Sequence, residues 1–167
     1  MTHMFLHADF WHILLNMWAL YILGPDCERE LGRTRFLIFY FSTGIGAAIF
    51  HSIATPYKRI PCIGASGAIF GLLAAYAVFF PKRKLGIWIG VGFIFVPAYI
   101  FAILYAFVET LYVLSGVTDL VAHTAHIGGF LVGVTFAFVH KKARRKGLRI
   151  HPYEITYYEF EREYEYW

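Results

Sequence analysis

Five long stretches of the chain carry no Asp, Glu, Lys or Arg. These stretches cover residues 10–24, 36–53, 60–80, 85–108 and 120–139. Most of them approach the ~20 apolar residues that a helix needs to cross the hydrocarbon core of a bilayer. The pattern therefore predicts an all-α, polytopic membrane helical bundle with about five transmembrane helices in one domain.

Proline and glycine suggest where these helices begin and end. Gly24-Pro25 is expected to end the first helix, a charged turn follows over 26–35, and Pro56 and Pro61 exclude a continuous helix over 54–63. The remaining helices are expected from Ser66 to Pro81, over 86–108 with Pro97 as a kink, and over 121–139 after a short outer loop at 114–120.

Composition and charge support a membrane protein and suggest its orientation. The chain is 59% hydrophobic and only 16% charged, and its mean hydropathy is +0.55. Lys and Arg follow the first, third and fifth stretches, so the positive-inside rule predicts a cytoplasmic C-terminus. The net charge of +4 belongs to these anchors and indicates no nucleic-acid partner.

We expect a membrane domain over 1–140 and a cytoplasmic tail over 141–167, basic and then acidic and aromatic, in a prokaryotic cell membrane.

Polar side chains inside the predicted spans are costly and are candidates for function, and four of them stand out. They are His12, Asn16, Ser66 and His126. At ~1.5 Å per residue, Ser66 and His126 each stand roughly 22 Å above the basic residues that follow their helices, and His12 stands roughly 18 Å above Gly24. Side chains that are distant in the sequence are therefore expected at one depth, which favours a shared site.

The residues around Ser66 and His126 suggest how two helices could bring them together. Gly67 and Gly71 lie four residues apart after Ser66, and Gly129 and Gly133 repeat that spacing after His126. Two such glycine faces can pack nearly backbone to backbone in a membrane. We therefore expect the serine hydroxyl to come within ~3 Å of the imidazole.

These groups are the parts of an acyl-transfer site. Ser66 would be the nucleophile and His126 the general base, while His12, Asn16 and the backbone N–H of Ser66 would stabilise an oxyanion. Asp9, Glu109 and Asp119 are expected nearer the outer surface, so no carboxylate is predicted at the depth of the site. The prediction is a Ser-His dyad whose imidazole is held by packing against Phe70.

Three motifs, in this order, resemble the rhomboid family: His-x3-Asn at 12–16, Gly-x-Ser-Gly at 64–67 and Ala-His-x2-Gly-x3-Gly at 125–133. The resemblance implies an intramembrane serine protease that cuts membrane proteins in or near their transmembrane segments, without metal or cofactor. It also implies that the fourth helix and the 114–120 loop act as gate and cap. Compared with the six-helix core of that family, the chain is expected to lack the first transmembrane helix and the first loop.

Two other functions remain open on the sequence alone. One is a catalytically inactive rhomboid-like protein that binds membrane clients. The other is a metal-binding or transport bundle that uses His12, His123 and His126. The sequence contains no His-Glu-x2-His motif, and no acidic partner is expected within a span. The sequence predicts transmembrane protein substrates and a lipid bilayer as partners, and it leaves the oligomeric state undetermined.

Overall fold

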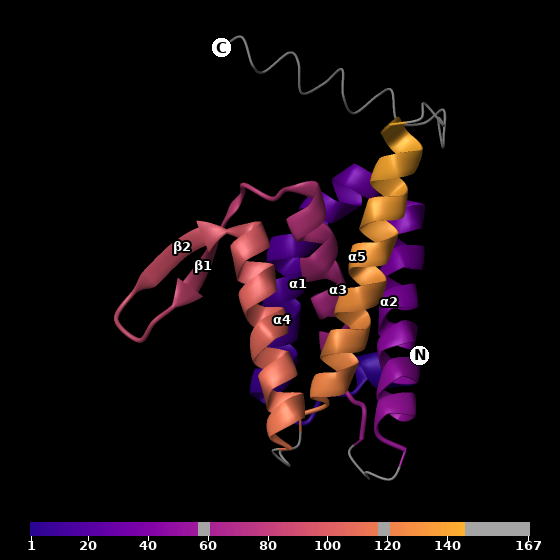
Figure 1. The fold of residues 1–167 in the computed structure, drawn as a ribbon, viewed down its shortest axis with the longest axis vertical. Helices are drawn as coiled ribbons and strands as arrows, with labels where there is room; N and C mark the ends of the chain where they lie inside the picture. Colours follow the sequence, from indigo (N-terminus) through magenta and orange to yellow (C-terminus); the bar gives the residue numbers. More distant parts are fainter. Residues whose placement is uncertain (57–60, 117–120, 146–167) are drawn as a thin grey trace.

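The computed structural model describes residues 1–56, 61–116 and 121–145. A short 3-10 helix, η1 (Thr2–Phe5), precedes two long helices, α1 (Phe10–Leu31) and α2 (Arg33–Ala54). They are followed by α3 (Ser66–Phe79), strands β1 (Lys84–Trp88) and β2 (Phe93–Pro97), α4 (Ala98–Ser115) and α5 (His123–Arg145). Figure 1 shows the five α-helices of the described ranges running alongside one another, with the two strands projecting from the bundle.

Helix α3 lies at the centre of the bundle, in contact with each of the other four α-helices. Nine of its 14 residues are buried, most of them Ala, Gly or Leu. Small side chains let neighbouring helices approach closely where no water drives their association. The element that begins with Ser66 is therefore the one that the bundle encloses most completely.

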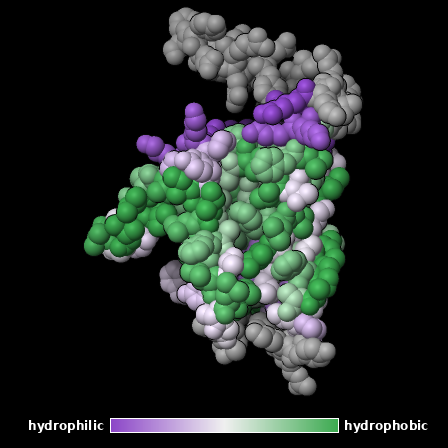
Figure 2. All heavy atoms as spheres, viewed as in Figure 1, coloured by the Kyte–Doolittle hydropathy of each residue, from purple (hydrophilic) through white to green (hydrophobic). Residues whose placement is uncertain are grey.

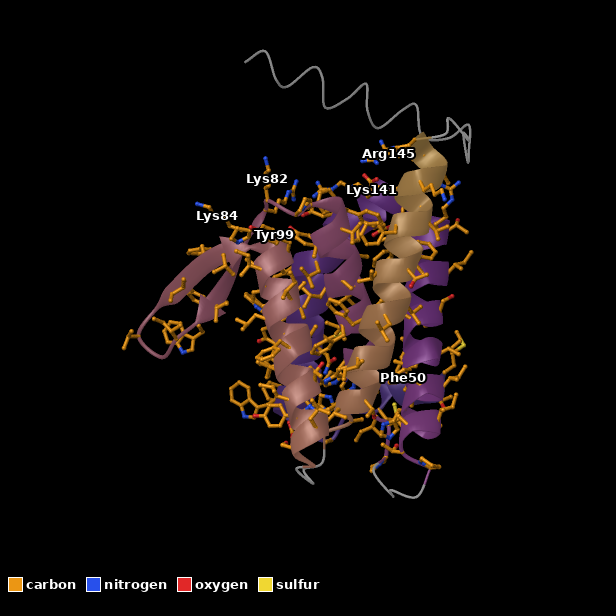
Figure 3. The ribbon with its side chains drawn as sticks, in the orientation of Figure 1. Phe50, Lys82, Lys84, Tyr99, Lys141 and Arg145 are labelled. Carbon is orange, nitrogen blue, oxygen red and sulfur yellow. The ribbon has the colours of Figure 1, made fainter. Side chains whose placement is uncertain are left out.

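The surface is that of a membrane protein. Apolar side chains cover most of the face shown in Figure 2, and hydrophilic residues gather at the end where α5 finishes. Lys82, Lys84, Lys141 and Arg145 all lie at this end (Figure 3). Two helices of the described chain, α2 and α4, are long and apolar enough to cross a membrane, and α3 is a shorter apolar helix. The predicted membrane helical bundle is confirmed.

The expected end of the first helix at Gly24-Pro25 was wrong, because α1 continues through Pro25 to Leu31. Pro25 removes one backbone donor but does not stop the helix, since tertiary contacts hold the next turn. The Asp26 carboxylate there accepts hydrogen bonds from Arg29, Arg83 and Tyr76. The break comes instead at Gly32, whose positive φ of 78° a side chain would disfavour.

The predicted helix over 86–108 was also wrong in its first half. Residues 84–97 form an antiparallel hairpin in which Lys84 pairs with Pro97 and Trp88 with Phe93. Glycine explains the turn, because Gly90 has a φ of +90° and Ile89 N–H donates to the Gly92 carbonyl at 2.9 Å. Pro97 is not a kink but the residue before α4. The fourth helix therefore starts twelve residues later than expected, at Ala98 instead of residue 86.

Three predicted segments fall partly outside the described residues. They are the loop at 54–63, of which 57–60 is not described, the outer loop at 114–120, of which 117–120 is not described, and the tail, described only to Arg145. Helix α5 passes the predicted domain boundary at residue 140 and ends at Arg145. The acidic and aromatic part of the tail lies outside the described range.

Candidate active site

Ser66 and His126 come from the two helices that pack most closely in the bundle. Ser66 is the first residue of α3, and His126 lies in the first turn of α5. The Ser66 Oγ lies 2.8 Å from the His126 Nε2, within hydrogen-bond distance. The serine is half-buried and the imidazole is buried. A hydroxyl and an imidazole at this separation can exchange a proton directly.

The glycines explain how two helix backbones come so close. A Cβ added to Gly129 would overlap the Gly67 carbonyl oxygen, and one added to Gly133 would overlap that of Gly71. On the opposite side of α3, a Cβ on Gly67 would stand 2.6 Å from Ala47 Cβ, in α2. Helices α3 and α5 thus touch through their backbones, and the short serine side chain spans the remaining gap.

The imidazole of His126 stacks on Phe70, which lies one turn after Ser66 on α3. The two rings are nearly parallel, with an interplanar angle of 5° and centroids 4.3 Å apart. Phe70 in turn lies 6.1 Å, ring centre to ring centre, from Tyr105 of α4. This packing restricts the rotation of the imidazole while its Nε2 faces Ser66.

The two side chains predicted as oxyanion donors, His12 and Asn16, lie on α1, one turn apart. His12 stands beside the loop before Ser66, since a Cβ on Gly64 would lie 2.6 Å from its Nε2. Asn16 is buried, and its amide donates to the His12 carbonyl at 2.6 Å, which leaves a second amide N–H. Within the described ranges, no hydrogen bond joins either residue to Ser66 or His126. Both lie on the α1 side of the site, and neither is hydrogen-bonded to the nucleophile in the part of the chain that the structure describes.

The expectation that no carboxylate reaches this depth was wrong. Glu109 is 8% exposed, and its Oε2 lies 3.0 Å from His126 Nδ1 and 2.6 Å from His123 Nδ1. The late start of α4 explains the error, because Glu109 follows Ala98 by eleven residues, or roughly 17 Å of helix. Two sequence signals would have placed Glu109 correctly. They are the glycines at 90 and 92, which indicate a turn, and Pro97, which indicates the start of a helix.

Glu109, His123 and His126 also form a group whose potential metal-ligand atoms all lie within 4.8 Å of one another. The sequence had suggested His12 rather than Glu109 as the partner of these histidines. Two ligands bound to zinc at ~2.0–2.1 Å in tetrahedral geometry lie roughly 3.3 Å apart. The 2.6 Å between His123 Nδ1 and Glu109 Oε2 is instead a hydrogen-bond distance. The group as it stands is a hydrogen-bonded carboxylate with two imidazoles.

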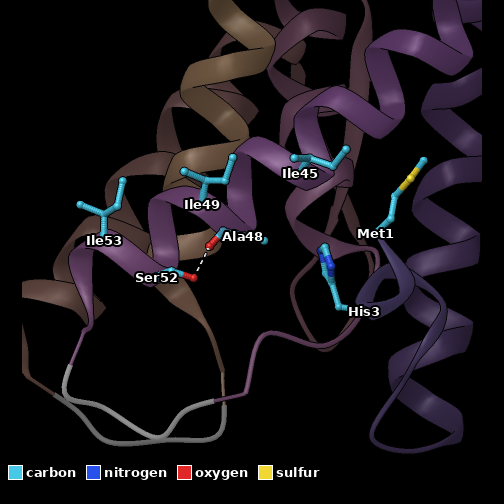
Figure 4. A pocket seen from close by; sticks show the side chains of 7 residues that line it. All are labelled: Met1, His3, Ile45, Ala48, Ile49, Ser52 and Ile53. Carbon is cyan, nitrogen blue, oxygen red and sulfur yellow. Dashed lines mark hydrogen bonds between the residues drawn. The ribbon is translucent and has the colours of Figure 1, made fainter.

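Figure 4 shows a separate hollow between the N-terminal residues and α2, lined by Met1, His3, Ile45, Ala48, Ile49, Ser52 and Ile53. The Ser52 hydroxyl donates to the Ala48 carbonyl of its own helix at 2.8 Å. Neither Ser66 nor His126 lines this hollow. Ser52 is therefore an exposed serine outside the candidate site, which makes it a suitable control.

Most of the chain is similar to known proteins of one family. A family model described as the Rhomboid domain matches residues 1–143. YdcA of Bacillus subtilis is 34% identical over 145 residues, which cover 86% of this chain and 68% of that protein. Mitochondrial rhomboid protein 1 of Saccharomyces cerevisiae is 30% identical over 151 residues, covering 85% of this chain and 41% of that protein. The rhomboid protease AarA of Providencia stuartii is 36% identical over 93 residues, covering 47% of this chain and 33% of that protein. The chain thus spans less than half the length of the last two proteins.

Proposed function

The chain belongs to the rhomboid family, and on that premise we propose that it is an intramembrane serine endopeptidase that cleaves membrane proteins in or near their transmembrane segments. The observation that carries the proposal is the 2.8 Å contact between Ser66 Oγ and His126 Nε2. A serine hydroxyl is a weak nucleophile until an adjacent base accepts its proton. His126 is that base, and it lies at the start of α5, close to the start of α3.

The reaction is acyl transfer in two steps. The Ser66 Oγ attacks the peptide carbonyl carbon while its proton moves to His126 Nε2, and a tetrahedral intermediate forms. The intermediate collapses with cleavage of the C–N bond, and His126 returns the proton to the leaving amine. Water then attacks the acyl ester and gives a proton to His126. The bond between the acyl carbon and Ser66 Oγ breaks, the carboxyl product leaves, and His126 returns the proton to Oγ.

The developing oxyanion needs donors that are already in place. The backbone N–H of Ser66 is one of the first in α3, and these groups have no partner inside their own helix. The second N–H of the Asn16 amide and the His12 ring, both from α1, would complete the oxyanion site. One preorganised donor contributes roughly 3–4 kcal/mol in comparable hydrolases.

The proposed orientation puts the C-terminus in the cytoplasm, because Lys82, Lys84, Lys141 and Arg145 gather at one end of the bundle (Figure 3). Ser66 and His126 then lie nearer the opposite face, which would be the side where substrates are cut. Helix α4 would form the gate through which a transmembrane substrate enters. The relatives include bacterial and mitochondrial proteins, so the prokaryotic cell membrane stays a prediction.

The alternative of an inactive client-binding relative is not favoured. A binding protein has no need for a hydroxyl and an imidazole in hydrogen-bond contact, or for a ring stacked to fix that imidazole. A metal-binding bundle is disfavoured by the close hydrogen bond between His123 and Glu109.

The test is cleavage of a membrane-anchored reporter by the reconstituted full chain. Ser66→Ala removes the nucleophile and should abolish cleavage while leaving the thermal unfolding midpoint within a few degrees, because one hydroxyl at a helix start contributes little to packing. Ser52→Ala is the matched control, since it removes an exposed hydroxyl bonded only to its own helix, and it should cleave as the parent does. Cleavage by the Ser66→Ala protein would exclude the proposed function.

A further inference from the structure

A buried carboxylate is costly in a membrane unless charge or hydrogen bonds compensate it. Glu109 is such a group, on the inward face of α4. Its Oε2 lies between two imidazoles of α5, 2.6 Å from His123 Nδ1 and 3.0 Å from His126 Nδ1. The two histidines are three residues apart on one face of that helix, so one oxygen reaches both.

The position of Glu109 relative to the His126 ring has a chemical consequence. The Nε2 of that ring faces Ser66, and Nε2 can accept a proton only while the single proton of the neutral ring sits on Nδ1. A carboxylate on the Nδ1 side favours that tautomer. It also stabilises the imidazolium that forms when the serine proton arrives.

We propose that Glu109 is a positioning residue that holds His126 in the reactive tautomer, so that Ser66, His126 and Glu109 act together as a triad. This inference rests on the proposed protease function. The serine proton moves from Oγ to Nε2, the Nδ1 proton stays on the ring, and the carboxylate remains ionised throughout.

His123 fixes the carboxylate for this task. It forms the hydrogen bond to Glu109, and its own ring stacks on Tyr112 of α4 at 4.6 Å with an interplanar angle of 2°. Among the residues that the structure describes, His126 Nδ1 has no well-aligned hydrogen-bond partner, although the carboxylate oxygen is 3.0 Å away. Catalytic hydrogen bonds are often poorly aligned before substrate binds and tighten in the complex. A small rotation of His126 on the Phe70 face would complete the contact.

The experiment compares Glu109→Gln with the parent in reporter cleavage, measuring kcat and KM separately. Glutamine keeps the shape but removes the charge, so kcat should fall by about tenfold to about a thousandfold, with KM changed less than about threefold. Glu109→Asp keeps the charge and should retain more activity than Glu109→Gln. Ser52→Ala is the control, because this hydroxyl is exposed on α2, away from the site and from the proposed gate, and bonds to the Ala48 carbonyl of its own helix. It should leave both constants unchanged.

A spectroscopic measurement separates positioning from a merely structural role. In protein labelled with ¹⁵N-histidine, we expect a His126 Nδ1–H proton resonance at low field, which shifts upfield in Glu109→Gln and stays in place in Ser52→Ala.

Two results would overturn the proposed role of Glu109. One is a kcat for Glu109→Gln within about threefold of the parent; the other is a parent spectrum in which His126 carries its proton on Nε2. Neither result would contradict the proposed protease function, which the Ser66→Ala variant tests separately. If Glu109→Gln does not fold, the parent spectrum and the Glu109→Asp rate decide.

Discussion

Replacing Gly129 by alanine tests whether the backbone contact between α3 and α5 is what sets the active-site geometry. The added Cβ would overlap the Gly67 carbonyl oxygen, a backbone atom that cannot rotate away. To lengthen this contact from 1.9 Å to the 3.0 Å below which real Cβ atoms are essentially never found, the two helices must separate locally by at least about 1 Å. Gly129 lies one turn from His126, so the imidazole moves with it.

The size of the effect follows from this displacement. A shift of about 1 Å would lengthen the 2.8 Å distance between Ser66 Oγ and His126 Nε2 beyond the ~3.2 Å limit of a good hydrogen bond. A misplacement of that size can lower turnover by about a hundredfold. Forcing one methyl group into a close-packed contact should also destabilise the fold by about 1–3 kcal/mol. We therefore expect Gly129→Ala to fold, to melt at a lower temperature and to cleave about a hundredfold more slowly.

The assay is single-turnover cleavage of the reporter in liposomes, with thermal unfolding measured on the same samples. Gly92→Ala is the matched control, since a Cβ on Gly92 would meet nothing within 4 Å, and it should behave as the parent in both measurements. A Gly129→Ala protein that is folded and cleaves within about threefold of the parent rate would show that the glycine contact does not set the catalytic distance.

Two further substitutions probe the groups around the dyad. Asn16→Ala removes one proposed oxyanion donor, so kcat in the reporter assay should fall by roughly tenfold to a few hundredfold; an unchanged kcat would remove Asn16 from the oxyanion site. Phe70→Leu removes the ring stacked on His126, an interaction of about 0.5–1.5 kcal/mol. It should lower kcat by about twofold to about tenfold without changing KM, and a raised KM alone would instead indicate a substrate contact.

The sequence predicted the part of the site that depends on local patterns. The starts of the helices at Ser66 and near His126, and the glycine spacings at 67/71 and 129/133, are local features. A glycine face lets two helices pack backbone to backbone. These spacings were therefore enough to predict that the helices of Ser66 and His126 meet.

The parts that were missed depend on contacts between distant segments. Pro25 stays inside α1 because Asp26 is held by Arg83, more than fifty residues later. Except for Lys84, the hairpin over 84–97 lies in a charge-free stretch that periodicity alone could not distinguish from a helix. Glu109 was placed too near the surface because the fourth helix was expected over 86–108, which ends just before it, whereas α4 runs from Ala98 to Ser115. Because of this error in one helix boundary, the contact between Glu109 and His126 was not predicted.

The most direct test of the account is to label the protein with a fluorophosphonate and identify the modified residue by mass spectrometry. A reactive serine is expected to form a covalent adduct at Ser66 in the parent, with labelling lost in Ser66→Ala and strongly slowed in His126→Ala. An adduct elsewhere, or labelling of Ser66 at the same rate without His126, would contradict the central claim that the imidazole activates this hydroxyl.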